Sequence, residues 1–161
     1  MNKKVAFIGH RDFLPIDINE RIYTIVKNEI LSGNDTFTMG THGQFDYESL
    51  KVCRELRKKY NHINIEIVIT SLNKIKPIVI KDIFRTEIYK PYDDVTTKMY
   101  EIEETYYKRQ ITKSNCNMIE DCDILICYVN PNKKRSGAKT TLKYATKLGL
   151  KIINLYKEED N

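Results

Sequence analysis

The chain has 161 residues, of which 41% are hydrophobic and 30% are charged, with no Trp and no low-complexity tract. This length suits one domain that buries about 70% of its unfolded surface, and the composition excludes a disordered chain. The net charge of +5 is compatible with an anionic ligand. Because Lys and Arg are interleaved with Asp and Glu and form no basic tract, charge alone does not indicate nucleic acid as a partner.

The sequence also argues against membrane and metal-binding classes. No stretch reaches the roughly 18 apolar residues of a membrane span, and the first residues lead into a strand-like run instead of a signal peptide. We therefore expect a cytoplasmic protein with no membrane partner. Paired C-x-x-C spacing is absent, so we expect reduced packing thiols and neither a metal nor a cofactor at the four cysteines, Cys53, Cys116, Cys122 and Cys127.

The first segment predicts a strand followed by a helix. Residues 5–8 form a short apolar run ended by Gly9, which is typical of a strand buried on both faces of a parallel sheet. Asp17 lies three residues before Glu20, which predicts a capped helix start. Apolar residues then recur at helical spacing until Gly33 offers a left-handed stop.

A second strand and helix follow, and then a less regular segment. Residues 36–39 predict a strand ended by Gly40, and residues 45–60 keep a period near 3.6. Residues 63–69 are rich in Ile and predict a third strand. Residues 74–91 mix extended and turn signals, so their structure stays open.

The last third predicts two more helices and two more strands. Residues 100–122 are expected to be helical in their second half, and residues 123–129 form another buried strand. The final helix is closed by Gly149, and residues 152–155 form the last strand. A polar tail, residues 157–161, is expected to fray.

This alternation of strands and helices predicts an α/β fold. Residues 1–156 should form a single Rossmann-like domain, with a mostly parallel sheet and helices on both faces. Ligands of such sheets bind at the carboxyl ends of the strands. We therefore looked for site residues in the loops that leave those ends.

Three loops of this kind carry candidate ligand-binding residues. The first is Gly9-His10-Arg11, where glycine admits a close approach and the guanidinium can grip phosphate; a plain turn with a solvated Arg11 is the alternative. The second contains Gly40, Thr41, His42, Gly43, Phe45 and Asp46, directly before a helix N-terminus that favours anions. The third contains Ser136, Gly137, Ala138, Lys139 and Thr140, which resemble a phosphate cradle but lack P-loop spacing.

Some roles within these loops stay open. Asp46 is expected to cap its helix, or else to accept hydrogen bonds from a ribose hydroxyl. His10 and His42 stand at strand ends where a general base would be useful, but no nucleophile or orienting partner is recognisable beside them. Stacking on a base is possible for Tyr100, Tyr106 and Tyr107, although tyrosines on helices usually pack.

The order of these motifs resembles the SLOG superfamily, which joins the Smf/DprA proteins and the LOG phosphoribohydrolases, and within it the small YpsA-like bacterial and phage proteins. The motifs that carry the resemblance cover nearly the whole chain: residues 7–11, residues 37–46, residues 113–119 before Asp123, and residues 136–140 with Tyr144-Ala145. The resemblance implies a Rossmann-like fold with a pocket for nucleotides or nucleotide-derived molecules, often in a homodimer. It adds Asn115 to the candidate ligand-binding residues.

Two departures from the family pattern affect the expected function. Relatives carry Arg-Asn where this chain has Ser114-Asn115, so one cation is missing. The phosphoribohydrolases carry a glutamate after their glycine-rich run, and residues 137–143 contain no acid. We therefore expect a protein that senses or sequesters a nucleotide-type signal, such as a cyclic or ADP-ribose-type nucleotide, and that acts as a homodimer or higher homo-oligomer.

The alternative is a nucleotide phosphoribohydrolase, an N-glycosidase in which Asp46 or Glu48 replaces the missing acid. A module that binds DNA is a third class. The chain has no separate basic stripe interleaved with aromatic residues, so nucleic acid is not the expected partner.

Overall fold

A parallel sheet of six strands organises the protein. The computed structural model describes residues 2–161, and within them the sheet has the order β6-β3-β2-β1-β7-β8, with every neighbouring pair parallel. The strands are β1 (Lys4–Gly9), β2 (Thr36–Met39), β3 (Asn64–Ile69), β6 (Thr96–Met99), β7 (Ile124–Tyr128) and β8 (Lys151–Asn154). The expected Rossmann-like α/β fold is confirmed.

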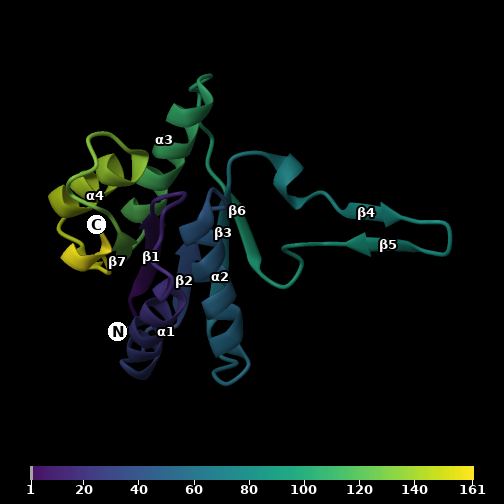
Figure 1. Ribbon diagram of the computed structural model, residues 1–161, viewed down its shortest axis with the longest axis horizontal. Helices are drawn as coiled ribbons and strands as arrows, with labels where there is room; N and C mark the ends of the chain where they lie inside the picture. The colour runs from purple at the N-terminus through teal and green to yellow at the C-terminus, as the bar shows by residue number, and fades with distance from the viewer. Residues whose placement is uncertain (1) are drawn as a thin grey trace.

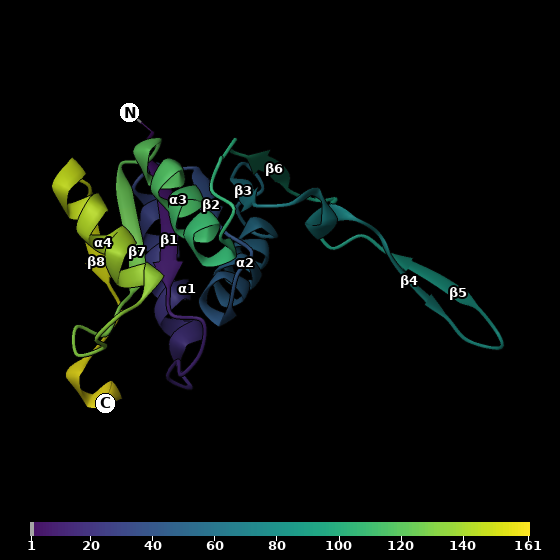
Figure 2. The same cartoon turned by 90° about the horizontal axis from the view of Figure 1, so that it is seen from above.

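Helices cover both faces of this sheet (Figure 2). They are α1 (Ile18–Leu31), α2 (Gln44–Arg57), α3 (Tyr107–Glu120) and α4 (Gly137–Leu148). Alternation along β1 explains the two layers: Val5 and Phe7 belong to the core beneath α1 and α2, whereas Ala6 and Ile8 belong to the core beneath α3 and α4. Among residues 2–161, no helix has the length and apolar character that crossing a membrane requires.

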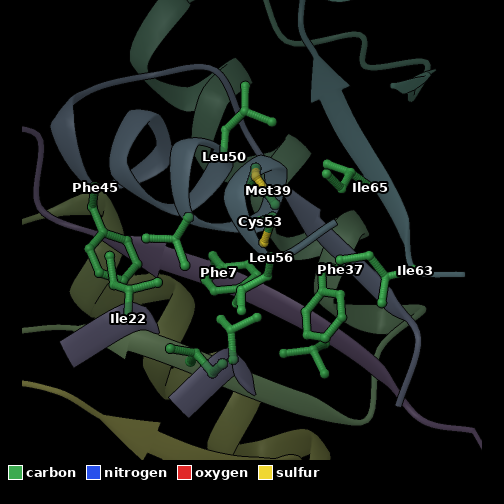
Figure 3. Close-up of a cluster of buried hydrophobic side chains, with 14 of the residues drawn as sticks. Phe7, Ile22, Phe37, Met39, Phe45, Leu50, Cys53, Leu56, Ile63 and Ile65 are labelled. Carbon is green, nitrogen blue, oxygen red and sulfur yellow. The ribbon is translucent and has the colours of Figure 1, made fainter. Parts of the chain in front are cut away.

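The larger of the two cores lies between the sheet and the helices α1 and α2 (Figure 3). Phe7 and Phe37 stack at 6.3 Å between ring centroids, and both side chains are fully buried. Burial of one large apolar side chain contributes about 1.5 to 3 kcal/mol to stability. The periodic residues that predicted α1 and α2 therefore pack with strand residues in one apolar core.

The helix boundaries agree with the sequence, but the cap of α1 does not. Asp17 is the N-cap residue, yet its side chain makes no cap hydrogen bond. Its carboxylate instead accepts from the Arg21 guanidinium at 3.1 Å. The charged partner one turn along the helix outcompetes the backbone amides, which is why the predicted capping box is absent.

An extension separates β3 from β6. After the short 3-10 helix η1 (Leu72–Ile75), strands β4 (Ile78–Lys81) and β5 (Thr86–Tyr89) pair as an antiparallel hairpin. We call residues 72–90 the arm, because they project far from the sheet (Figures 1 and 2). This hairpin and the edge strand β6, whose Thr-Thr-Lys-Met sequence lacks an apolar pattern, are the elements that the sequence did not predict.

The C-terminal tail is docked, so the expectation of fraying is wrong. Residues Glu158–Asp160 form the 3-10 helix η2. The Asp160 carboxylate accepts two hydrogen bonds from the Arg21 guanidinium, at 2.6 and 2.8 Å, and a third from the Tyr128 hydroxyl. This side chain is only 5% exposed, because α1 and β7 close over it.

The strand order places a switch point between β1 and β7. From β1 the chain proceeds outward through β2, β3 and β6, and it then returns to the other side of β1 to form β7 and β8. The loops after β1 and β7 therefore diverge at the carboxyl edge of the sheet. Parallel sheets leave a crevice for ligands at such a point.

Candidate functional site

A cavity of about 760 Å³ lies at this switch point. Its wall comes from the end of β1 and the loop after it, the loop after β2, the first turn of α2, the first half of α3, the loop after β7 and the first turns of α4. The volume lies within the range of roughly 300 to 1,000 Å³ that is usual for small-molecule sites. The sheet topology thus places a ligand-sized hollow at the edge that the sequence predicted.

The cavity gathers eleven of the fifteen predicted site residues. They are Gly9, His10, Arg11, His42, Asp46, Asn115, Ser136, Gly137, Ala138, Lys139 and Thr140. The other four, Gly40, Thr41, Gly43 and Phe45, are not part of the wall. The second loop therefore contributes through His42 and Asp46, while its remaining residues support them from outside.

Gly9 has a packing role that the sequence did not reveal. A Cβ atom at Gly9 would overlap the ring of Phe45, which is 1% exposed at the start of α2. Glycine thus lets α2 approach the end of β1 closely. The first loop was expected to use glycine for the approach of a ligand, and the structure assigns the space to Phe45.

Gly43 joins the first and second loops. Its φ is +98°, and a Cβ there would lie 2.7 Å from the Cα of Arg11. The Gln44 N–H donates to the Arg11 carbonyl at 2.8 Å. The N-terminus of α2 is therefore partly occupied by the first loop, and it is not the open anion site that the glycine pair predicted.

Asp46 is one of the two acidic residues of the cavity wall. Its Oδ2 accepts from the His42 N–H at 3.0 Å, and it lies behind Gly40, where a Cβ would come within 2.9 Å. The carboxylate therefore fixes the loop before α2, but it does not cap the helix as expected, because the N-cap residue is Gly43 and no side chain makes a cap hydrogen bond there. Burial raises the pKa of Asp46 to about 7, although the His42 N–H and the Arg11 charge oppose this shift. Oδ1 makes no hydrogen bond within residues 2–161 and remains available to a ligand.

His10 is buried and fixed in one tautomer. Its Nε2 accepts from the Asn130 N–H at 2.9 Å, so the neutral ring carries its proton on Nδ1. Burial and the nearby Lys133 charge lower the pKa of His10, so the ring is neutral at pH 7. Nδ1 is buried and has no hydrogen-bond partner within residues 2–161. An acceptor on a bound ligand or a water would satisfy this donor.

His42 is held on both sides of its ring. Nε2 lies 3.1 Å from the Thr70 hydroxyl, and Nδ1 lies 3.4 Å from the Tyr107 hydroxyl. Burial and the charges of Lys74 and Arg11 lower the pKa of His42 to about 4. The imidazole is therefore uncharged at neutral pH and has no carboxylate to orient it as a catalytic base.

Positive charge dominates the cavity wall. Seven cationic side chains line it: Arg11, Lys108, Lys133, Lys134, Arg135, Lys139 and Lys143. Within residues 2–161 the wall carries two carboxyl groups, those of Asp12 and Asp46, and burial keeps Asp46 partly protonated. The net field therefore attracts anions.

The N-terminus of α4 faces the same space. The Ser136 hydroxyl accepts from the Lys139 N–H at 3.0 Å and caps the helix. The first N–H groups of the helix, those of Gly137 and Ala138, have no intrahelical acceptor and lie on the cavity wall. The Lys139 ammonium donates to the carbonyls of Pro131 and Lys133, which folds the basic loop over this end. Free amides, the helix dipole and cations together form an anion site.

Sequence reasoning missed the contribution of α3. Lys108, Ile111 and Thr112 line the cavity within the two turns before Asn115 and supply a cation, an apolar surface and a hydroxyl. These residues are spaced three and four apart from one another and from Asn115, so the sequence could have predicted that they share the helix face of Asn115. Ser114, which replaces an arginine of the resembled family, is 3% exposed and is not part of the wall, whereas Lys108 brings a cation from the same helix.

The tyrosines and cysteines contribute little to this wall. The Tyr100 hydroxyl donates to Asp121, away from the cavity, and Tyr106 is not among the wall residues. Tyr107 is not among the wall residues either, but its ring contacts the wall residue His42 edge-on, with 6.0 Å between ring centroids. In the part of the chain that the structure describes, no group of His, Cys, Asp and Glu side chains is arranged to hold a metal ion.

Fold and cavity together define the class: a Rossmann-like α/β domain with a cation-rich cavity at its switch point. The sequence matches no protein-family model, and it matches none of the curated proteins.

Proposed function

We propose that this chain is a cytoplasmic protein that binds a nucleotide or nucleotide-derived signal molecule, such as a cyclic or ADP-ribose-type nucleotide, and thereby senses or sequesters it. The observation that carries the proposal is the cavity of about 760 Å³, whose wall combines seven cations with the open N-terminus of α4. The resemblance to the SLOG superfamily points to the same ligand class. The working form is proposed to be a homo-oligomer.

Each part of a nucleotide has a matching group on the cavity wall. A phosphate fits the amides of Gly137 and Ala138, with charge supplied by Arg135 and Lys143. A ribose hydroxyl can donate to Oδ1 of Asp46, on the part of the wall that α2 contributes. Ile111 offers an apolar contact for the face of a base. The arrangement favours an elongated ligand with a polyanionic end.

A ligand panel tests this proposal. Purified protein is mixed with nucleoside phosphates, cyclic nucleotides and ADP-ribose, and binding is followed by thermal shift and calorimetry. We expect at least one member to bind and to raise the melting temperature through mass action. Absence of binding by every member at millimolar concentration would refute the proposal.

A matched pair of variants on α4 localises the binding. Lys143→Ala removes a cation of the wall, whereas Lys147→Ala removes an exposed cation one turn further along the same helix. We expect Lys143→Ala to weaken binding roughly tenfold, since a charge-assisted contact contributes about 1.5 to 3 kcal/mol. Lys147→Ala should bind like the parent chain. Equal losses would indicate general charge attraction without a defined site.

A second candidate function rests on Asp46. A carboxyl group with a pKa of about 7 can donate a proton at neutral pH, as a general acid must. This favours hydrolysis of an N-glycosidic bond as the alternative. Of the two acids considered from the sequence, Asp46 lines the cavity, whereas Glu48 lies outside its wall and accepts from Asn19 and Gln44.

Prolonged incubation with nucleoside monophosphates at high protein concentration separates binding from turnover. Release of free base, abolished in Asp46→Asn, would establish the hydrolase. Intact nucleotides together with measurable binding would establish the binding protein.

A further inference from the structure

The arm exposes apolar side chains on both of its faces. Every residue from Ile75 to Lys90 is exposed, and the two tip residues, Ile83 and Phe84, are each 90% exposed. Along the strands, Ile78 and Ile80 lie on one face, and Val79 lies with its cross-strand neighbour Ile88 on the other. A two-stranded hairpin is marginally stable in water without further packing. The arm is therefore built to contact something outside its own chain.

The hydrogen-bond pattern shows which backbone groups are free. The Asp82 N–H donates to the Arg85 carbonyl at 3.0 Å, so Asp82 and Arg85 form a hydrogen-bonded pair at the end of the hairpin. Such pairs alternate along an antiparallel ladder. Ile80 and Ile78 therefore point their backbone groups toward β5, whereas Val79 and Lys81 point theirs away from it. The outer edge of β4 presents these unpaired donors and acceptors to solvent.

We propose that the outer edge of β4 pairs antiparallel with the outer edge of β4 in a second copy of this chain, so that two arms form one four-stranded sheet. The two-fold axis passes between the Val79 residues of the two copies. There each Val79 N–H donates to the Val79 carbonyl of the other copy, as in a hydrogen-bonded antiparallel pair. A sheet of four strands removes the marginal stability of the separate hairpin.

This register also provides partners for the residues of the β4 edge on either side of Val79. Lys81 lies opposite Pro77 of the second copy, whose carbonyl can accept from the Lys81 N–H. Pro77 lacks an N–H and needs no acceptor. One step further, Asp82 lies opposite Lys76 of the second copy, so an opposite charge pair forms at each end of the shared ladder.

Apolar side chains also meet in this register. Ile78 lies opposite Ile80 of the second copy on one face. On the other face the two Val79 side chains continue the row begun by each Ile88. The tip residue Ile83 then points toward the base of the other arm, where Leu72 and Ile75 of η1 are 61% and 40% exposed. The exposed apolar tip of each arm thus contacts the exposed apolar base of the other arm.

The edge of β5 is less suited to such pairing. Its strand carries Glu87 within and Lys90 directly after, and charges at an edge discourage further strand pairing. On β4 the residues 78–80 are uncharged, and the one charged residue, Lys81, ends the strand and lies opposite the uncharged Pro77 in this register. We therefore assign the interface to β4, and pairing through β5 is the outcome that would contradict the assignment.

Charge substitutions test the interface. The full chain should sediment and scatter light as a dimer, and a monomer at all concentrations up to the millimolar range would overturn the proposal. Val79→Lys places like charges opposite each other at the axis, which should weaken the dimer roughly tenfold or more. Ile88→Lys makes the same change on the same face of the hairpin, but on the outer strand β5. The two introduced lysines are then separated by both β4 strands, and the dimer should persist. Loss of the dimer in Ile88→Lys with retention in Val79→Lys would refute the β4 pairing.

Disulfide trapping gives a second readout. Paired Val79 residues should lie about 5.5 Å apart between Cα atoms, within the range of roughly 4.4 to 6.8 Å that a disulfide bridges. Val79→Cys should therefore form a covalent dimer on oxidation, above the level of the parent chain. In the same sheet the two Ile88 residues are about 14 Å apart, three strand spacings, so Ile88→Cys should not cross-link. Cross-linking through Ile88 and not through Val79 would show that β5 forms the interface instead.

Discussion

The Asp46 carboxylate accepts a hydrogen bond from the His42 N–H at 3.0 Å while its other oxygen stays open toward the cavity. One side chain thus fixes the loop after β2 and supplies an acid to the candidate site. Because burial raises its pKa to about 7, its charge changes near neutral pH. His42, with a pKa of about 4, and His10, with a lowered pKa, stay neutral in that range.

The raised pKa of Asp46 predicts that its ionisation destabilises the fold. The native state holds this proton more tightly than the unfolded chain, whose value is 3.8. Protonated Asp46 therefore contributes its full amount to the free energy of unfolding below about pH 4. This contribution falls as the pH rises toward 7 and is lost above it. Asp46→Asn keeps the acceptor for the His42 N–H and removes the titration. Between pH 5 and 7 the parent should lose on the order of 2 kcal/mol relative to this variant, since one pH unit is worth at most about 1.4 kcal/mol.

Urea unfolding of both proteins at several pH values provides this measurement. Parallel pH profiles would show that Asp46 titrates in its ordinary range.

The same titration predicts pH-dependent ligand binding. A cyclic nucleotide is the suitable probe, because its phosphodiester does not titrate near neutrality. Protonation of Asp46 removes a negative charge from the cavity, so affinity should rise several-fold as the pH falls from about 8 to about 6. Calorimetry of Asp46→Asn should give a nearly constant affinity over this interval. A similar rise in the variant would assign the effect to another group.

Gly9→Ala should destabilise the protein through the contact with Phe45. The added Cβ overlaps a ring that is enclosed between β1 and α2, and such overpacking costs about 1 to 3 kcal/mol. Gly137→Ala is the matched control, because a Cβ there meets one atom, the Thr112 hydroxyl oxygen at 3.1 Å, in an exposed helical position. Thermal unfolding should show a clear loss for the first variant and little change for the second. Equal melting temperatures would contradict the packing role of Gly9.

Arg11→Ala and Gly137→Asp should weaken ligand binding with little effect on stability. Alanine keeps the Arg11 carbonyl that accepts from Gln44 and the Cβ that packs on Gly43, and it removes the exposed guanidinium. Aspartate at residue 137 puts a negative charge at the N-terminus of α4, where it competes with a phosphate and suits the helix dipole. Each change should raise the dissociation constant about tenfold or more. Large losses of melting temperature in both variants would mean that these loops are structural.

Asp160→Ala should show that the C-terminal tail stabilises the domain. It removes the carboxylate that holds Arg21 and leaves that guanidinium, 11% exposed, with Asp17 and the Leu155 carbonyl as partners. A loss of about 2 to 3 kcal/mol is expected. Arg21 and the Lys157 and Tyr128 donors also lower the pKa of Asp160, so this contribution is lost only at acidic pH. Glu159→Ala, an exposed neighbour in η2, serves as the control and should unfold like the parent.

The sequence and the structure agree where local patterns are strong. The apolar runs at residues 5–8 and 123–129 are strands because a run of that kind fits a sheet covered on both faces. By contrast, β6 is an exposed edge strand that forms because it pairs with β3. Its own residues therefore have no apolar pattern that would predict a strand. The hairpin was equally indistinct, because its apolar residues face solvent on both sides.

The features of the candidate site also divide into those that local sequence predicts and those that depend on the folded structure. Local sequence is enough to identify three loops at strand ends that carry glycines, hydroxyls and cations, since turn chemistry and strand order are local properties. The space that Gly9 leaves for Phe45, the burial that raises the pKa of Asp46 and the place of Lys108 in the cavity wall follow from the assembled fold. Desolvation and close packing depend on neighbours distant along the chain, and those neighbours meet only when the sheet and its helices assemble.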